Sequence, residues 1–258
     1  MCFYLGSRSP SDSTSDSEPL FNGFKMGRAV VMRLTLLLGG IVFDKAKEDQ
    51  AILDAYRDVI IRLVERGYKL IVVAGGGRLA REYIESASRY GVNKAFLDYI
   101  GIMATRLNAA LVIASLWSKA YPRVPETYEE ALNGIRSHDV VVMGGIAPAQ
   151  STDAVAAVMS EMADSKLMIK ATGAKGVYDR PPEEPGATFL PKVTYRELLR
   201  IVQKYQFEPG KYELLDPIAI KVLERSNVRC VILNGLEPQA VLEAVSGEEV
   251  GTVVGEVV

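Results

Sequence analysis

Three consecutive glycines, Gly75 to Gly77, stand between an apolar run and a segment of helical spacing that carries Arg78 and Arg81. The pattern predicts a strand over 69–74, a tight turn and the start of a helix. Glycine lets backbone N–H groups approach a ligand closely, and a helix N-terminus carries partial positive charge. The stretch is therefore a candidate site for an anion such as a phosphate, although a glycine turn after a strand is by itself a weak signal.

Two more glycine turns follow apolar runs. Gly39 and Gly40 end a predicted strand over 30–38, and a third turn follows a predicted strand over 140–143. This third turn leads into Ser-Thr-Asp at 151–153, residue types that suit an N-cap and a first helical turn. Turns at the carboxyl ends of parallel strands converge on one edge of a sheet, which is where open parallel sheets bind ligands.

The order of the remaining elements predicts an α/β fold. Helical spacing over 49–65 separates the first two strands, and a βαβ unit implies a parallel sheet. Further strands are expected at 167–172 and 228–234, with a long polar loop over 173–189. Further helices are expected at 98–116, 127–132, 195–202, 212–226 and 237–245.

The predicted helix over 98–116 is apolar nearly all round, yet it contains Asp98, Arg106 and Asn108. Polar groups on a buried helix need partners. Two interpretations stay open: Asp98 and Arg106 satisfy each other or backbone groups, or they contact a ligand.

The composition narrows the classes of function. The 258 residues are 48% hydrophobic and 24% charged with a net charge of −2, which favours small-molecule partners over nucleic acid or a membrane surface. Two cysteines and one histidine argue against a disulfide framework and a zinc site, and no metal ligands are predicted. We expect a reducing, cytoplasmic compartment and no run of the roughly 20 apolar residues that a membrane-spanning helix needs.

The first 28 residues are rich in Ser, Asp and Pro and are expected to be a disordered tail. Met26 and Met32 lie close to the first predicted strand, which favours the hypothesis that the tail is partly a start-codon artefact. A single domain is expected over 29–258.

Five segments together resemble the amino acid kinase superfamily, and specifically its archaeal type of uridylate (UMP) kinase. They are AGGGRLAREYI, LDYIGIMATRLNA, VVMGGIAPAQSTDAVAA, KATGAKGVYD and YELLDPIAIKVLERS, and the match runs from about Leu34 to the C-terminus. The P-loop spacing GxxxxGK[ST] is absent from the sequence.

The resemblance implies a three-layer α/β/α sandwich with a central, mostly parallel sheet. It implies that UMP and ATP meet head to head over the strand ends, with Mg²⁺ held mainly by the nucleotide phosphates. An acceptor-binding part would span about 29–165 and an ATP-binding part about 166–258. The resemblance also implies a homohexamer built as a trimer of dimers.

The resemblance also implies roles for individual residues. The UMP phosphate would meet the three glycines and Arg81, Asp98 would contact the ribose, and the third turn would bind uridine and phosphate. The implied substrate-binding set is Gly75, Gly76, Gly77, Arg81, Asp98, Gly145, Ser151 and Thr152. The implied ATP-side set is Gly39, Thr172, Gly176, Val177, Tyr178 and Asp216, and the implied catalytic set is Lys221, Lys175 and Gly40.

This chain departs from the family pattern on the ATP side. The family's first strand ends in a phosphate-clamping lysine, whose position falls here on Leu37, and the following serine falls on Gly39. The family's TNVDGVY segment reads TGAKGVY, so that Lys175 replaces an aspartate. Loss of one such charge-stabilising group typically costs roughly 10²–10³ in rate.

Three hypotheses follow. The first is ATP-dependent phosphorylation of UMP to UDP in pyrimidine nucleotide biosynthesis. The second is a catalytically weakened relative that binds a nucleotide as a sensor or a partner subunit. The third is a superfamily kinase that acts on another phosphorylated or carboxylate acceptor.

Overall fold

The computed structural model describes residues 32–205 and 214–255, so the tail expected over 1–28 lies outside the described residues. A seven-stranded sheet forms the centre of the molecule, in the order β3-β2-β1-β4-β8-β9-β7. Its strands are β1 (Arg33–Leu38), β2 (Lys69–Ala74), β3 (Val140–Met143), β4 (Leu167–Thr172), β7 (Lys192–Val193), β8 (Arg229–Asn234) and β9 (Thr252–Val254).

The five strands β3, β2, β1, β4 and β8 are parallel, and β9 runs antiparallel to β8. Their residues are almost continuously buried, as expected for a parallel sheet that is covered on both faces. Cys230 of β8 is part of this core, and burial raises the pKa of its thiol to about 12. It is therefore a packing residue and not a nucleophile.

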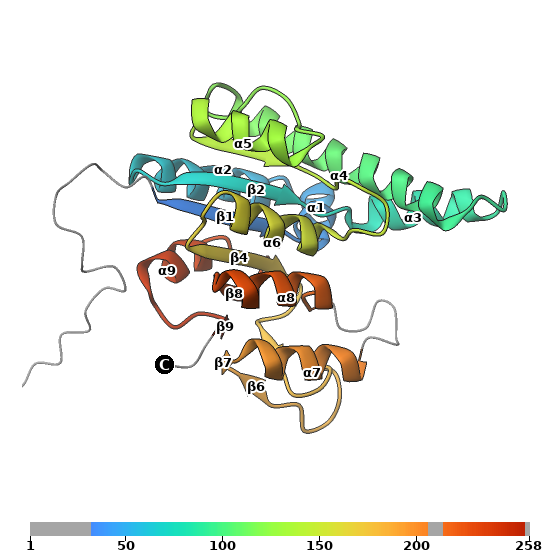
Figure 1. Ribbon diagram of the computed structural model, residues 1–258, viewed down its shortest axis with the longest axis vertical. Helices are drawn as coiled ribbons and strands as arrows, with labels where there is room; N and C mark the ends of the chain where they lie inside the picture. Colours follow the sequence, from blue (N-terminus) through green and yellow to red (C-terminus); the bar gives the residue numbers. More distant parts are fainter. Residues whose placement is uncertain (1–31, 206–213, 256–258) are drawn as a thin grey trace, which may run out of the picture.

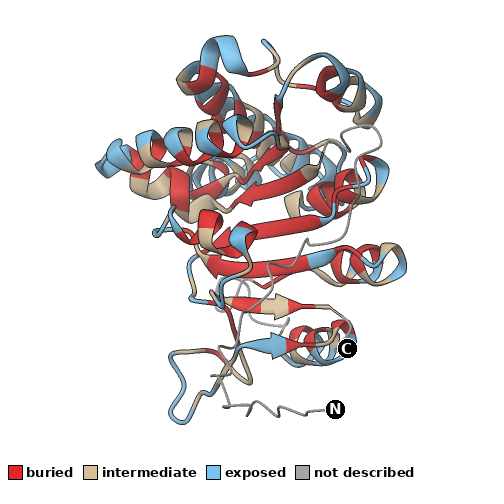
Figure 2. Ribbon diagram, turned by 90° about the vertical axis from the view of Figure 1, so that its left-hand side faces the viewer, coloured by how far each residue is buried: buried red, intermediate tan, exposed pale blue. Residues whose placement is uncertain are grey.

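Helices cover both faces of the sheet (Figures 1 and 2). The helices that pack on one face are α1 (Gly40–Glu48), α2 (Ala51–Glu65), α4 (Lys94–Leu116) and α9 (Ala240–Ser246). Those on the other face are α5 (Tyr128–Ser137), α6 (Thr152–Met162), α7 (Tyr195–Tyr205) and α8 (Pro217–Ser226). α3 (Gly77–Ser88) packs against α4, and the two project together from the body of the molecule (Figure 1). The expected three-layer sandwich is confirmed.

Several predicted boundaries hold and others were wrong. The strands predicted at 69–74, 140–143 and 167–172 have those bounds. The Gly39-Gly40 turn leads at once into α1, which the sequence analysis missed. The loop expected over 173–189 contains one strand of a small antiparallel hairpin, β5 (Val177–Tyr178) with β6 (Phe189–Leu190).

The helix expected over 212–226 starts instead at Pro217. Asp216 is its N-cap, because the carboxylate accepts hydrogen bonds from the backbone N–H groups of Ile218 (2.7 Å) and Ala219 (2.9 Å). Proline at the first helical position suits this start.

The connections place a topological switch point between β1 and β4. The chain moves from β1 to β2 and β3 on one side, then returns across β1 to β4 and β8 on the other. Ligands of open α/β sheets bind outside the carboxyl ends of the strands at such a point.

α4 contradicts one expectation from composition. In the described part of the chain, the segment Lys94–Lys119 is long and apolar enough to cross a membrane by those two measures alone. A single such helix is weak evidence, because core helices meet the same criteria. Here Ala109, Val112 and Leu116 of this segment are buried in the core.

Candidate functional site

A cavity of about 1230 Å³ lies over the carboxyl ends of β1, β2, β3 and β4. It is lined by all three glycine turns and by the segments that follow β4 and precede α8. A cavity for one drug-sized ligand has about 300–1,000 Å³. The volume of this cavity exceeds that range and leaves room for two small ligands.

The first two glycine turns touch each other through their backbones. The N–H group of Gly75 donates to the Leu38 carbonyl at 2.8 Å. A Cβ atom on Gly40 would lie 2.4 Å from the Cα atom of Gly77. Gly77 also has a φ of 61°, a conformation that L side chains rarely adopt. Only glycines can bring these two turns so close together.

Arg81 lies one turn into α3, beside the triple-glycine turn. Its Nη2 atom donates to Asp44 Oδ2 at 3.1 Å, and Asp44 Oδ1 accepts from the backbone N–H group of Arg78 at 2.7 Å. A carboxylate of this chain therefore contacts the N-terminal turn of α3, where the sequence analysis expects an anion. The sequence analysis did not single out Asp44.

The third turn is held by α4. The Thr105 hydroxyl accepts a hydrogen bond from the Gly145 N–H group at 2.7 Å, and Asp98 Oδ2 accepts one from the Ala149 N–H group at 2.9 Å. Arg106 donates to the Gly145 carbonyl and pairs with Glu126. Of the two interpretations left open, mutual pairing of Asp98 and Arg106 is thus wrong, while both contact backbone groups.

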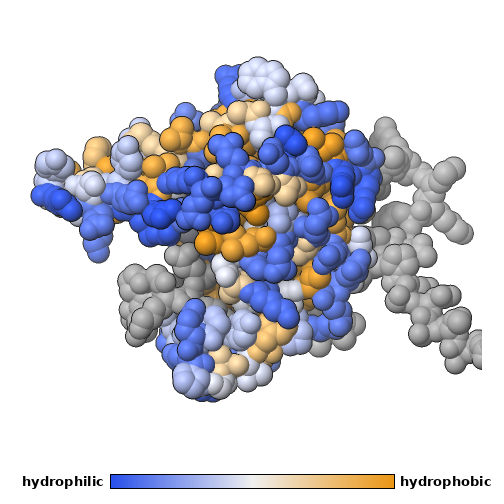
Figure 3. All heavy atoms as spheres, turned by 180° about the vertical axis from the view of Figure 1, so that it is seen from behind, coloured by the Kyte–Doolittle hydropathy of each residue, from blue (hydrophilic) through white to orange (hydrophobic). Residues whose placement is uncertain are grey.

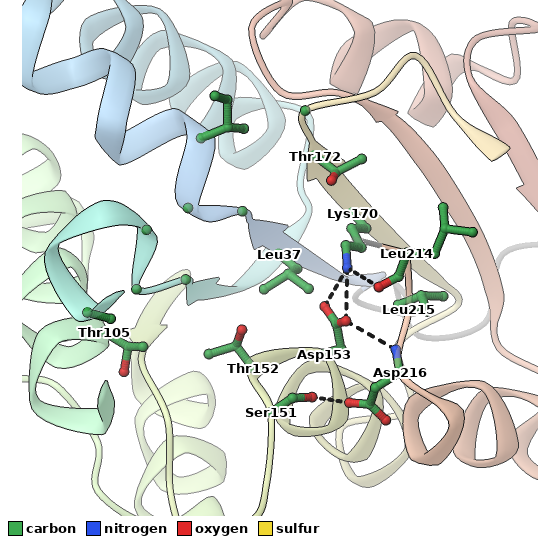
Figure 4. Close-up of a pocket in the computed structure, with 18 of the residues that line it drawn as sticks. Leu37, Thr105, Ser151, Thr152, Asp153, Lys170, Thr172, Leu214, Leu215 and Asp216 are labelled. Carbon is green, nitrogen blue, oxygen red and sulfur yellow. Dashed lines mark hydrogen bonds and ion pairs between the residues drawn. The ribbon is translucent and has the colours of Figure 1, made fainter. Parts of the chain in front are cut away.

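Asp153 and Lys170 form a buried ion pair on the floor of the cavity (Figure 4). Lys170 Nζ lies 2.8 and 2.9 Å from the two carboxylate oxygens of Asp153 and donates to the Leu214 carbonyl at 3.0 Å. Burial raises the pKa of the Asp153 carboxyl, and the charge of Lys170 opposes that rise. Asp153 also accepts from the Asp216 N–H group at 3.2 Å, and the side chains of Asp216 and Ser151 are hydrogen-bonded.

The loop after β4 forms the other end of the cavity. Thr172, Lys175 and Tyr178 line it, and Lys175 Nζ lies 5.0 Å above the centre of the Phe189 ring. Gly176 and Val177 do not line it. Gly176 packs against Thr252 instead, since a Cβ atom there would lie 2.5 Å from Thr252 Oγ1.

Most of the residues named from the sequence thus meet around one cavity. Those that line it are Gly39, Gly40, Gly75, Gly76, Gly77, Arg81, Asp98, Gly145, Ser151, Thr152, Thr172, Lys175, Tyr178 and Asp216. The structure does not bring Lys221 to the cavity: it is exposed on α8, away from the capped start of the helix.

Two residues on the floor of the cavity, Lys170 and Asp153, are not among the candidate site residues expected from the sequence, where they fall in a predicted strand and a first helical turn. The available signal was a lysine inside a run whose other members are apolar or small, two residues before the strand ends at Thr172.

The fold and the site define a class of protein with a central, mostly parallel sheet and a glycine-lined cavity at its switch point. The model of the amino acid kinase family matches residues 32–234, and the chain belongs to this family. The chain is similar to several archaeal proteins named uridylate kinase. That of Sulfolobus acidocaldarius is 42% identical over 226 residues, covering 86% of this chain and 99% of the relative. That of Hyperthermus butylicus is 41% identical over 208 residues, covering 80% and 92%.

Solved structures agree with this assignment. The uridylate kinase of Archaeoglobus fulgidus superposes with a TM-score of 0.78 at 36% identity, covering 87% of this chain and all of that chain. A UMP kinase from Bacillus anthracis has a TM-score of 0.70 at 21% identity, which shows the shared fold alone. The resemblance to archaeal uridylate kinases is confirmed.

Proposed function

We propose that this chain is an ATP-dependent UMP kinase, which transfers the γ-phosphoryl group of ATP to the phosphate of UMP and releases UDP and ADP. One observation carries the proposal: a single cavity extends from the glycine turn beside Arg81 to the loop of Thr172 and Lys175. One end suits an acceptor phosphate and the other a donor nucleotide. The relatives named uridylate kinase favour UMP as the acceptor.

The acceptor end combines three features that suit a phosphate monoester. The turn of Gly75, Gly76 and Gly77 lines this end of the cavity at the start of α3, and Arg81 offers a guanidinium that can bind two oxygens at once. Asp98 and Thr152 line the same end and are the proposed contacts for the ribose and the phosphate.

The donor end lies beyond β4. Thr172, Tyr178 and Asp216 line it, and Lys175 is the cation in its exposed loop. Phosphoryl transfer depends mainly on positioning and on cations that neutralise the transferring group. Mg²⁺ would be held mainly by the nucleotide phosphates. Asp216 lines the cavity, and its carboxylate caps α8 and is hydrogen-bonded to Ser151. The division into an acceptor part over 29–165 and a donor part over 166–258 belongs to the same proposal.

The test is formation of UDP and ADP from UMP, ATP and Mg²⁺, with CMP and acetylglutamate as alternative acceptors. We expect turnover with UMP and at most slow turnover with the other two. Binding of UMP by calorimetry without any turnover would refute the kinase and identify a nucleotide-binding subunit. Turnover with acetylglutamate alone would identify the wrong acceptor.

Arg81 provides a sharper test of the acceptor end. We expect Arg81→Ala to weaken UMP binding by about tenfold to a hundredfold, because a hydrogen bond to a charged group contributes about 1.5–3 kcal/mol. Arg78→Ala is the matched control: it lies three residues earlier on α3, but its side chain pairs with Glu48 and Glu82 and does not line the cavity. Equal UMP affinities for the two variants would refute the assignment.

The projecting pair α3 and α4 supports the proposal that the chain assembles with copies of itself, as a hexamer built from dimers. α4 exposes large apolar side chains along one stripe, and Figure 3 shows hydrophobic atoms among polar ones on this projection. Such contiguous apolar surface marks interaction sites. We further propose that the enzyme acts in the cytoplasm, where uridylate, the substrate named for its relatives, would reach it.

A further inference from the structure

The end of β1 lacks a cation, and the neighbouring strand carries one. Leu37 and Lys170 are register partners across β1 and β4, so their side chains leave the same face of the sheet side by side. They lie next to the strand ends, at the switch point, and both line the cavity (Figure 4). Lys170 thus places an ammonium one strand away from the position where the family pattern has a lysine.

The other described cations of the cavity lie at its two ends. Arg81 lies at the acceptor end on α3, and Lys175 lies in the exposed loop over the Phe189 ring. Lys170 lies on the strand between these ends, and its side chain is only 7% exposed. It is held by a bidentate contact to Asp153, which fixes its position and offsets the loss of water around its charge.

We propose that Lys170 is a catalytic residue that binds the phosphoryl group in transfer and replaces the missing lysine at position 37. This inference rests on the proposed kinase function. During transfer, the bond between the γ-phosphorus and the bridging oxygen of ADP breaks, and a bond forms from a UMP phosphate oxygen to that phosphorus. Lys170 neutralises the oxygens of the transferring group and keeps its protons.

The contacts of Lys170 show how it can reach a phosphate. Its three ammonium protons face three acceptors, the two oxygens of Asp153 and the carbonyl of Leu214. The Leu214 carbonyl is the neutral acceptor of the three, so its hydrogen bond is the weakest. A phosphoryl oxygen replaces this carbonyl while the ion pair to Asp153 stays in place.

The first experiment removes the charge of Lys170 without leaving a buried carboxylate unpaired. In the double variant Lys170→Met with Asp153→Asn, both side chains keep about their volume. We expect kcat to fall by about 10²–10³ while the affinity for UMP stays within threefold. The matched control is Lys166→Met with Asp164→Asn, an exposed Lys–Asp pair 2.7 Å apart outside the cavity, which should leave kcat unchanged. An unchanged kcat in the Lys170 and Asp153 variant would overturn the proposal.

The second experiment moves the lysine back to β1. Leu37→Lys combined with Lys170→Met keeps one lysine at the switch point, on the neighbouring strand in the same register. We expect at least a tenfold recovery of kcat relative to Lys170→Met alone. A merely structural ion pair predicts recovery of thermal stability without recovery of kcat, and that result would contradict a catalytic role.

A third measurement separates this inference from the proposed function. Calorimetry with Mg²⁺ compares ADP with a non-hydrolysable ATP analogue, and needs no turnover. We expect the wild type to prefer the triphosphate by at least about tenfold, and the variant with Lys170→Met and Asp153→Asn to lose that preference. Absence of UDP formation by the wild type would refute the function. Equal binding of both nucleotides by the wild type, or a retained preference in the variant, would refute the role of Lys170.

Discussion

At the scale of single residues, the carboxylate of Asp44 has two opposing effects on the proposed acceptor end. Its carboxylate accepts hydrogen bonds from Arg81 and from the first turn of α3, and its side chain is only 16% exposed. The proposed UMP phosphate is also an anion, so the two negative groups compete for the same donors. The carboxylate keeps Arg81 near the turn, but it opposes the binding of the phosphate.

We therefore expect Asp44→Asn to increase UMP affinity by at least about fivefold, because two like charges about 4 Å apart repel by about 1 kcal/mol even at the dielectric constant of bulk water. Calorimetry with UMP measures this change. Asp54→Asn is a suitable control, since Asp54 pairs with Arg57 on the exposed face of α2. A lower affinity in Asp44→Asn would mean that holding Arg81 in place outweighs the repulsion.

The sequence predicted the glycine turn beside Arg81 better than the floor of the cavity, for a physical reason. The glycine turn and the start of α3 bring Gly75, Gly77 and Arg81 together within seven consecutive residues. The conformation of such a short segment depends mainly on its own residue types. Lys170 and Asp153 are 17 positions apart and meet only because β4 and α6 pack together. No local pattern distinguishes this lysine from a strand residue, and its proposed role depends on the register that pairs it with Leu37.

At the scale of elements, the site depends on two glycine turns that touch. α1 starts at Gly40 and α3 at Gly77, and the two starts are in backbone contact. The sequence predicted both turns from their glycines. It did not predict α1, because Gly-Gly is a poor helix start by propensity and the helix is stabilised by burial of Val42 and Phe43.

We expect Gly40→Ala to lower the free energy of unfolding by about 1–3 kcal/mol, because its Cβ atom would force the two turns apart. It should also weaken UMP binding, since the backbone of the turn at Gly75 to Gly77 would shift. Denaturant unfolding and calorimetry measure the two effects. Gly173→Ala is the control for stability: a Cβ atom there meets nothing within 4 Å, so a change within about 0.5 kcal/mol is expected. Equal stability of the two variants would show that the turns can separate freely.

At the scale of the whole molecule, α4 connects the proposed active site to the proposed assembly. One side of the helix carries two residues that hold glycine turns at the edge of the cavity. Thr105 accepts a hydrogen bond from the Gly145 N–H group, and Asn108 donates one to the Gly75 carbonyl. The opposite side carries the exposed apolar stripe Phe96, Tyr99, Met103, Leu107 and Leu111, spaced three or four residues apart. A contact between copies through this stripe would fix the helix that positions the site.

We therefore expect Leu107→Asp, at a position that is 63% exposed, to dissociate the assembly into smaller species. A charge in the middle of an apolar contact loses its hydration without gaining a partner, so the contact fails while the exposed position leaves the fold intact. Sedimentation velocity measures the size, and a steady-state assay should show a raised KM for UMP because α4 is no longer held from outside. Met162→Asp, at a comparably exposed position at the end of α6, is the control and should change neither quantity. An unchanged sedimentation coefficient in Leu107→Asp would place the contact elsewhere, and dissociation with an unchanged KM would show that the site of each copy works on its own.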